Sequence, residues 1–319
     1  MAPRVLLLSV VLAAVLSAQD PIRGPMLGWV WDSKKESVRP VLGIAGSSVM
    51  GQGIDLGSAV KLGAVSGAQE FALVLLGDTR DVGIVDLKPL TPLLTRPELA
   101  AGAERFVLSP RGSAAALLYV GDTKKIVVVG GLPAAAGTLR EIDLTVEGTP
   151  AAMALSDDGA VVLAAYPDTL SVLIVDADGN RWKLPKEAAV NALAFLENSH
   201  DALISTDTGV YVAREVSANA ELRLLWEGAN AGPVAAIDSR RVLVVDNASQ
   251  SVVEVNLVSG PGRTVQCPCA PTGLSRMTGT GIFRLNEVSK GPLWLVEVQD
   301  TGLRTVFVPP DPSDPESEE

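Results

Sequence analysis

Residues 152–176 read Ala152-Met-Ala-Leu-Ser-Asp-Asp-Gly159, Ala160-Val-Val-Leu-Ala-Ala-Tyr166, Pro167-Asp168-Thr169 and Leu170-Ser-Val-Leu-Ile-Val-Asp176. Short apolar runs that are bounded by turn residues indicate β-strands. These runs are continuously apolar rather than alternating, which indicates strands that are buried on both faces. The stretch therefore predicts three successive strands, joined by an Asp-Gly turn and an Asp-Thr turn, in a sheet that is covered on both sides.

The same arrangement recurs along the chain. Asp-Thr pairs in an equivalent setting begin at Asp78, Asp122 and Asp207, and weaker copies lie at Asn247 and Asn286. The period of about 40 residues is typical of repeat architectures. Each repeat contains a first strand, a turn, a second strand, the Asp or Asn turn, a third strand and a shorter fourth strand. Four antiparallel strands per repeat, with neighbouring repeats covering both faces, predict an all-β protein with the β-propeller fold.

The number of blades stays open between six and seven at this point. Six full four-stranded repeats can be counted, and a hairpin pattern precedes them at Trp29–Trp31 and Val38–Leu42. A hairpin of short strands is marginally stable in water, so its order must come from docking. We expect it to lie beside the C-terminal blade and to close the ring, either as a partial seventh blade or as an extension of an edge.

The composition limits the classes of partner. The chain has 319 residues and a formal net charge of −11, which argues against nucleic acid and anionic membrane surfaces because both require Lys and Arg. The single histidine, His200, argues against zinc, copper and haem chemistry. We therefore expect no metal and no cofactor.

The two ends of the chain differ from the repeats. Arg4 and the apolar run Val5–Val15 precede small residues, as in a secretory signal that is cut near Ala18; a retained N-terminal anchor is the alternative. We assign residues 1–18 to the signal, 19–310 to the propeller and 311–319 to a disordered acidic tail. The mature protein is expected to be periplasmic or extracellular, with no membrane span.

Residues 154–159, the apolar strand and Asp-Thr turn after them, and the run that ends at Asp176 resemble repeats of bacterial secreted propellers of the YVTN and WD40-like kind. The resemblance covers roughly residues 26–310. Asp-Thr replaces the Val-Ala-Asn turn sequences of the type family, and no regular Trp-Asp pair ends the blades. Propellers of this broad class include binding scaffolds, lactone hydrolases and quinone-dependent dehydrogenases, so the resemblance implies a fold and not an activity.

The Asp and Asn turns are the first candidate site. Placed between the second and third strands, they would emerge on one face of the propeller, and the residues are Asp78, Asp122, Asp168, Asp207, Asn247 and Asn286. One interpretation is local, since Asp and Asn side chains accept backbone N–H groups and fix turns. The other is an electronegative ring that holds a cation or a basic partner. Calcium needs several converging oxygens, and each Asp-Thr turn has only one certain carboxylate, so we favour the local interpretation.

Three further features contain residue types that can carry chemistry. Cys267 and Cys269 are candidates for a disulfide bond across one residue, or for redox or metal chemistry, although two thiols are too few for a structural zinc site. His200 lies in a turn on the face opposite the Asp-Thr turns, and we interpret it as a surface residue. The five tryptophans are expected to pack at the outer edges of the blades; they are Trp29, Trp31, Trp182, Trp226 and Trp294.

No catalytic constellation stands out in these patterns. The leading interpretation is a monomeric, exported propeller that binds a protein or an extracellular polymer without catalysis. The alternative is a propeller enzyme of the lactonase or quinone-dependent dehydrogenase type.

Overall fold

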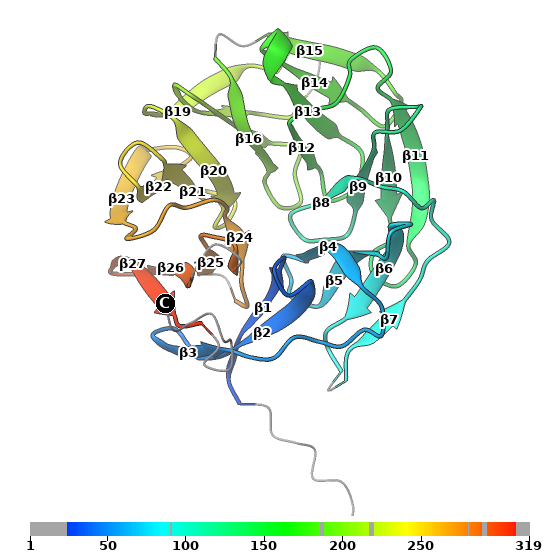
Figure 1. The fold of residues 1–319 in the computed structure, drawn as a ribbon. Coiled ribbons are helices and arrows are strands. Elements are labelled where there is room, and N and C mark those ends of the chain that lie inside the picture. Colours follow the sequence, from blue (N-terminus) through cyan, green and yellow to red (C-terminus); the bar gives the residue numbers. More distant parts are fainter. Residues whose placement is uncertain are drawn as a thin grey trace, which may run out of the picture.

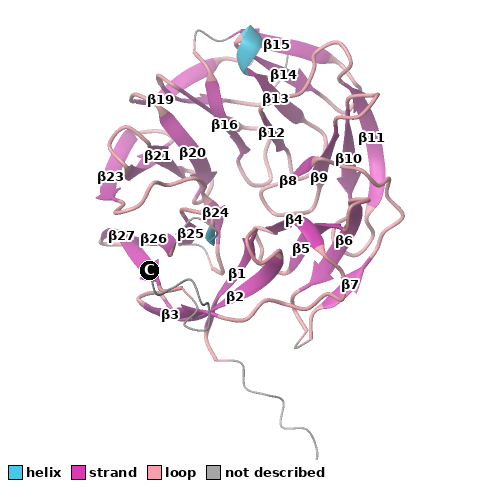
Figure 2. Cartoon of the chain, in the orientation of Figure 1, coloured by secondary structure: helices cyan, strands magenta, loops and turns pink. Residues whose placement is uncertain are grey.

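The computed structural model describes residues 24–89, 91–185, 188–216, 220–279, 281–288 and 292–310. Seven antiparallel sheets stand around a central axis and form a closed ring (Figure 1). Strands dominate the described residues, and η1 (Pro167–Thr169) is a single 3₁₀ turn (Figure 2). The expected signal, 1–18, and the acidic tail, 311–319, lie outside the described residues. No helix of the described residues is long and apolar enough to cross a membrane.

Six blades have four strands each, in chain order from the axis outward. Blade 2 contains β4 (Val60–Val65), β5 (Phe71–Leu76), β6 (Asp81–Asp86) and β7 (Leu93–Thr95). Blade 3 contains β8 (Arg105–Leu108), β9 (Ala115–Tyr119), β10 (Lys125–Gly130) and β11 (Gly137–Asp143). Blade 4 contains β12 (Ala152–Leu155), β13 (Val162–Tyr166), β14 (Ser171–Val175) and β15 (Arg181–Pro185). Blade 5 contains β16 (Val190–Phe195), β17 (Ala202–Thr206), β18 (Gly209–Ala213) and β19 (Leu222–Glu227). Blade 6 contains β20 (Ala231–Ala236), β21 (Arg241–Asp246), β22 (Ser251–Asn256) and β23 (Gly260–Gln266). Blade 7 contains β24 (Ser275–Arg276), β25 (Ile282–Arg284), β26 (Leu293–Gln299) and β27 (Gly302–Val308).

Blade 1 is built from the N-terminal segment and makes the ring seven-bladed. It contains β1 (Met26–Asp32), β2 (Ser37–Ile44) and β3 (Ser47–Met50), paired in that order. The strand β3 leads into β4, as the outermost strands of blades 2 to 6 lead into the blades that follow them. The central cavity of about 400 Å³ is lined from β4, β8, β12, β16, β20 and β24, and not from β1. Blade 1 therefore has the three outer strand positions and lacks the innermost one.

The cores lie between adjacent sheets. All residues of β5 and β13 are buried, which confirms the prediction of strands that are covered on both faces. In one cluster, Leu118 and Val128 of blade 3 pack against Leu155 and Leu173 of blade 4. Because each sheet presents apolar side chains on both faces, every blade depends on two neighbours.

The N-terminal hairpin lies beside the C-terminal blade, as predicted. Leu27 and Val41 share a core cluster with Leu295 and Val306 of blade 7. The backbone N–H of Thr278 also donates to the Leu27 carbonyl at 2.8 Å. The first and last segments of the chain are thus joined by apolar packing and by a main-chain hydrogen bond.

Gln69 fills part of the missing innermost position. It lies in the turn between β4 and β5, and its Oε1 accepts a hydrogen bond from the Trp29 N–H at 2.5 Å. Its Nε2 donates to the Arg276 carbonyl at 2.8 Å. One side chain therefore links blade 2 to blades 1 and 7. It also gives the inner edge of β1 a hydrogen-bond acceptor, which an innermost strand would otherwise supply.

Two glycines allow this close approach. A Cβ on Gly28, whose φ is +136°, would lie 2.6 Å from Gln69 Oε1. A Cβ on Gly63 would lie 2.5 Å from the Trp31 ring. Trp29 and Trp31 consequently pack at the inner end of blade 1, so the expectation that they lie at an outer edge was wrong. They are inside because the missing strand lets β1 approach the axis.

Gln69→Ala should lower the free energy of unfolding by about 1–3 kcal/mol, because it removes two hydrogen bonds and leaves the Trp29 N–H without its partner. Chemical denaturation measures the change. Gln250→Ala is a matched control, since Gln250 also has a left-handed φ, 52° against 60° for Gln69, and lies in an exposed turn. Equal losses in the two variants would contradict the role of Gln69 in closing the ring.

Candidate functional site

A groove of about 860 Å³ crosses one end of the propeller. It is formed by the turns between the first and second strands of blades 2 to 5, together with third-to-fourth-strand connections of blades 3 and 5. Its volume is within the range of ligand-binding sites. The polar and charged residues that line it include Glu70, Arg111, Asp157, Asp158, Asn198, His200 and Glu215.

A buried serine fixes three of the turns at this end of the blades. Ser66, Ser109 and Ser156 occupy the same position, just after the first strand, and all three are buried. The Ser156 hydroxyl accepts a hydrogen bond from the Val161 N–H at 2.9 Å, and the Ser109 hydroxyl accepts one from the Ala114 N–H at 3.2 Å. Such side-chain to backbone bonds define a local turn. The groove walls are therefore held by the backbone of the blades beneath them.

Asp157 connects three blades. Its Oδ1 accepts a hydrogen bond from the Arg111 N–H of blade 3, and its Oδ2 accepts one from the Asn198 N–H of blade 5, both at 2.8 Å. The Arg111 guanidinium also reaches from blade 3 to blade 5, where it donates to Asn198 Oδ1 at 3.1 Å. Charge-assisted bonds to backbone N–H groups are among the stronger hydrogen bonds, so this network fixes the relative positions of the turns of blades 3, 4 and 5.

His200 and Asp158 form a second contact across blades. His200 Nε2 lies 2.9 Å from Asp158 Oδ2, and the imidazole is about one-third exposed. Partial burial of Asp158 disfavours its charge, but hydrogen bonds from Ser156 Oγ, the Ala160 N–H and His200 outweigh burial and lower its pKa to about 2. The carboxylate is therefore ionised at neutral pH. It orients the imidazole within the groove, which goes beyond the surface role that we expected for His200.

The Asp and Asn turns lie at the opposite end of the blades. Asp78, Asp122, Asp168 and Asp207 are all exposed, and none of them lines the groove or the central cavity. Of these four, Asp78 lies 3.9 Å from Lys61 Nζ, and Asp207 accepts a hydrogen bond from Asn191. The structure places them on one face, as predicted. It does not bring them together.

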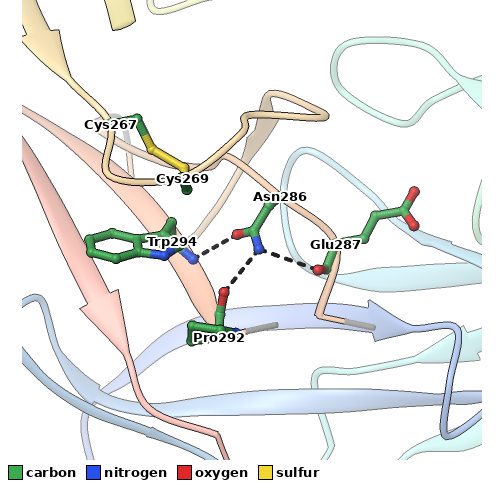
Figure 3. The surroundings of a disulfide bond; sticks show 6 residues. All are labelled: Cys267, Cys269, Asn286, Glu287, Pro292 and Trp294. Carbon is green, nitrogen blue, oxygen red and sulfur yellow. Dashed lines mark hydrogen bonds between the residues drawn. A yellow bond between two sulfur atoms is a disulfide. The ribbon is translucent and has the colours of Figure 1, made fainter. Parts of the chain in front are cut away.

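Asn286 and the cysteines belong to the packing of blade 7. Asn286 is buried; its Oδ1 accepts a hydrogen bond from the Trp294 N–H at 2.7 Å, and its Nδ2 donates to the Pro292 carbonyl at 2.9 Å (Figure 3). Cys267 and Cys269 form a disulfide bond with each other, within the connection that leads from blade 6 to blade 7. Asn247 is half-buried, with its amide against Gly232. No group of three or more His, Cys, Asp or Glu side chains that could hold a metal ion is present in the described residues.

Sequence reasoning missed Arg111, Asp157 and Asp158 as groove residues. The signal was present, because Ser109-Pro-Arg-Gly112 and Ser156-Asp-Asp-Gly159 occupy the same register one repeat apart. Alignment of the repeats on these serines, rather than on the Asp-Thr pairs, would have placed the polar residues of successive blades side by side.

Comparisons with known proteins agree with the architecture. A crystal structure of a functionally unknown protein from Desulfotomaculum acetoxidans matches with a TM-score of 0.59 and 13% identity, over 89% of this chain and 100% of that one. Kuenenia stuttgartiensis hydrazine synthase matches with a TM-score of 0.54 and 12% identity, over 93% of this chain and 99% of that one. The likeness shows the fold alone. No family model matches the chain, and no curated protein matches it in sequence.

Asp158→Asn should destabilise the protein at neutral pH by about 1 kcal/mol, a value that is discounted for the exposure of the carboxylate. The folded-state pKa of about 2 is below the ordinary value of 3.8. The stabilisation is therefore present above the ordinary pKa and is lost as the pH falls through about 2. Melting temperatures between pH 7 and pH 2 should show the wild type and the variant converging at the acid end.

The control is Asp300→Asn, at an exposed carboxylate in blade 7 outside the groove. Its melting temperature should remain at a constant offset from the wild type. An equally constant offset for Asp158→Asn would contradict the assigned pKa.

Proposed function

We propose that this protein is an exported binding propeller, which holds a basic segment of a partner protein in the groove across blades 2 to 5 and does not catalyse a reaction. The groove is the observation that carries this proposal. Export is supported by the signal-like pattern of residues 1–18 and by the disulfide between Cys267 and Cys269, because disulfides persist in oxidising compartments.

The charge of the groove favours a basic occupant. Four carboxylates line it, from Glu70, Asp157, Asp158 and Glu215, against the side chains of Arg111 and His200. Asp157 and Asp158 both accept hydrogen bonds from the protein, and the lowered pKa of Asp158 keeps that carboxylate ionised at neutral pH. The chain as a whole carries a net charge of −11, which favours encounter with a cationic partner.

The rigidity of the groove also favours binding. The turns are held by buried serines and by the Asp157 network, so little order has to be gained when a ligand binds. A preformed site loses less conformational entropy on binding than a mobile one. An extended segment that crosses four blades would contact all the turns at once.

The test is fluorescence anisotropy with a labelled nonapeptide rich in Lys and Arg, compared with an acidic peptide of the same length. The groove variant, Glu70→Gln with Glu215→Gln, should weaken binding of the basic peptide by roughly 2- to 30-fold, as expected for two exposed ion pairs. Binding should also weaken with added salt.

The matched control is Asp122→Asn with Asp168→Asn, which removes the same charge from the opposite face. Binding that is retained in this variant and weakened in the groove variant supports the proposal. Loss only in the control variant would favour the electronegative ring of Asp turns. No binding, or equal binding in both variants, would contradict a basic partner in the groove.

One observation favours an enzyme as the second candidate. A carboxylate that orients an imidazole, as Asp158 orients His200, is part of the arrangement by which histidine acts as a general base. A hydrolase of the lactonase type would use His200 in this way. A lactone-hydrolysis assay that is abolished by His200→Ala would support it, and a stoichiometric metal or quinone in the purified protein would support the wider enzyme class.

A further inference from the structure

A small cavity lies where the innermost strand of blade 1 would stand. Its volume is about 70 Å³, and it lies between β1, β4 and the first two strands of blade 7. Trp29 and Trp31 form one wall, Gln69 lies against them, and Arg284 lines the side that belongs to blade 7. The cavity is separate from the groove, and the proposed function does not use it.

Arg284 forms no ion pair at contact distance with a carboxylate of the described residues. Its one hydrogen bond there is a long contact of 3.5 Å from Nη2 to Ser275 Oγ. Burial lowers the pKa of its guanidinium, and the charge of Glu287 offsets this effect only in part. The residue is half-buried. A charged group that is partly removed from water is costly unless it is paired, so this guanidinium would be stabilised by an anionic partner.

Arg276, on the neighbouring strand, shows the contrast. Its guanidinium lies 3.0 Å from Glu197 and donates to the Ala236 and Ile237 carbonyls. Both arginines line the small cavity, but Arg276 is satisfied by protein groups of blades 5 and 6. Arg284 lines the cavity in the gap of blade 1, where no blade supplies an innermost strand.

We propose that Arg284 binds a carboxylate in this cavity. The planar guanidinium can donate two parallel hydrogen bonds to one carboxylate, and the low polarity of the tryptophan wall strengthens such a pair. The volume suits a group of a few atoms. A second donor is available, because Leu27 and Trp29 form hydrogen bonds on the inner edge of β1, and strand alternation places the Trp31 N–H on that same edge.

The carboxylate has two candidate sources. One is a small carboxylate from solution. The other is the acidic sequence of the chain itself after β27, since in the other blades the outermost strand is followed by the innermost strand of the next. Its acidic residues are Asp311, Asp314, Glu316, Glu318 and Glu319.

The experiment is thermal unfolding of the full chain in sodium acetate and in sodium chloride of equal ionic strength. It is run on the wild type and on a variant whose five acidic residues after β27 are replaced by Asn or Gln. Acetate should raise the melting temperature saturably, by about 2–3 °C at ten times its dissociation constant, because a ligand that binds only the folded state stabilises it.

Each outcome has a defined meaning. Saturable stabilisation of the wild type supports a free carboxylate as the ligand. Saturable stabilisation confined to the neutralised variant supports the proposal with the chain's own acidic residues as the source. Stabilisation in neither chain overturns the proposal.

Variants assign the effect to Arg284. Arg284→Gln should abolish the stabilisation by acetate, Arg284→Lys should weaken it because the fork is lost, and Arg240→Gln, at an exposed arginine outside the cavity, should leave it unchanged. The lysine variant keeps the charge and gives an independent measurement if the glutamine variant fails to fold. An acetate effect that persists in both Arg284 variants also overturns the proposal.

Discussion

Every sheet of this protein is apolar on both faces, so no blade can be stable until the ring is complete. The two middle strands of blades 2 to 6 are almost fully buried between neighbouring sheets. Burial of apolar surface is the dominant stabilising term in folding, and here that term is shared by every pair of adjacent blades. The ring must therefore close at blade 1, although blade 1 has only three strands. The hydrogen bonds of Gln69 and the one from Thr278 to Leu27 are polar contacts that support closure with one strand missing.

Closure also determines what the ends of the blades can do. Strands that are locked between neighbours carry their turns as fixed points, and the turns near the axis are close enough to bond to one another. Asp157 thus accepts hydrogen bonds from residues of both neighbouring blades. Turns between the second and third strands lie farther from the axis, and the carboxylates of Asp122 and Asp168 point into solvent. The same repeat therefore yields a connected polar groove at one end and separate charges at the other.

The sequence predicted what depends on local pattern. Continuous apolar runs such as Val161–Ala165 identified the buried strands, and the repeat period identified the blades. The missing strand of blade 1 was not predictable, because a hairpin pattern does not reveal which strand positions it will occupy. The pair of His200 and Asp158 was missed for a related reason. Its members are 42 residues apart, about one repeat, and they meet only because adjacent blades are in register. The regular spacing of the Asp-Thr pairs made them a candidate site. Regular spacing along the chain does not, however, make side chains converge in space.

The gap in blade 1 shows how a repeat fold tolerates a missing element. An absent strand removes main-chain partners from β1 and side-chain partners from the neighbouring blade. The side chain of Gln69 replaces part of the first loss, and Gly28 and Gly63 make room for it and for Trp31. The second loss has no equivalent replacement at Arg284, whose one side-chain hydrogen bond among the described residues is the long contact with Ser275. Since an unpaired guanidinium in a partly desolvated site costs stability, an apolar side chain at that position would be the simpler solution for packing alone. The arginine therefore makes more physical sense as half of an ion pair than as a packing residue.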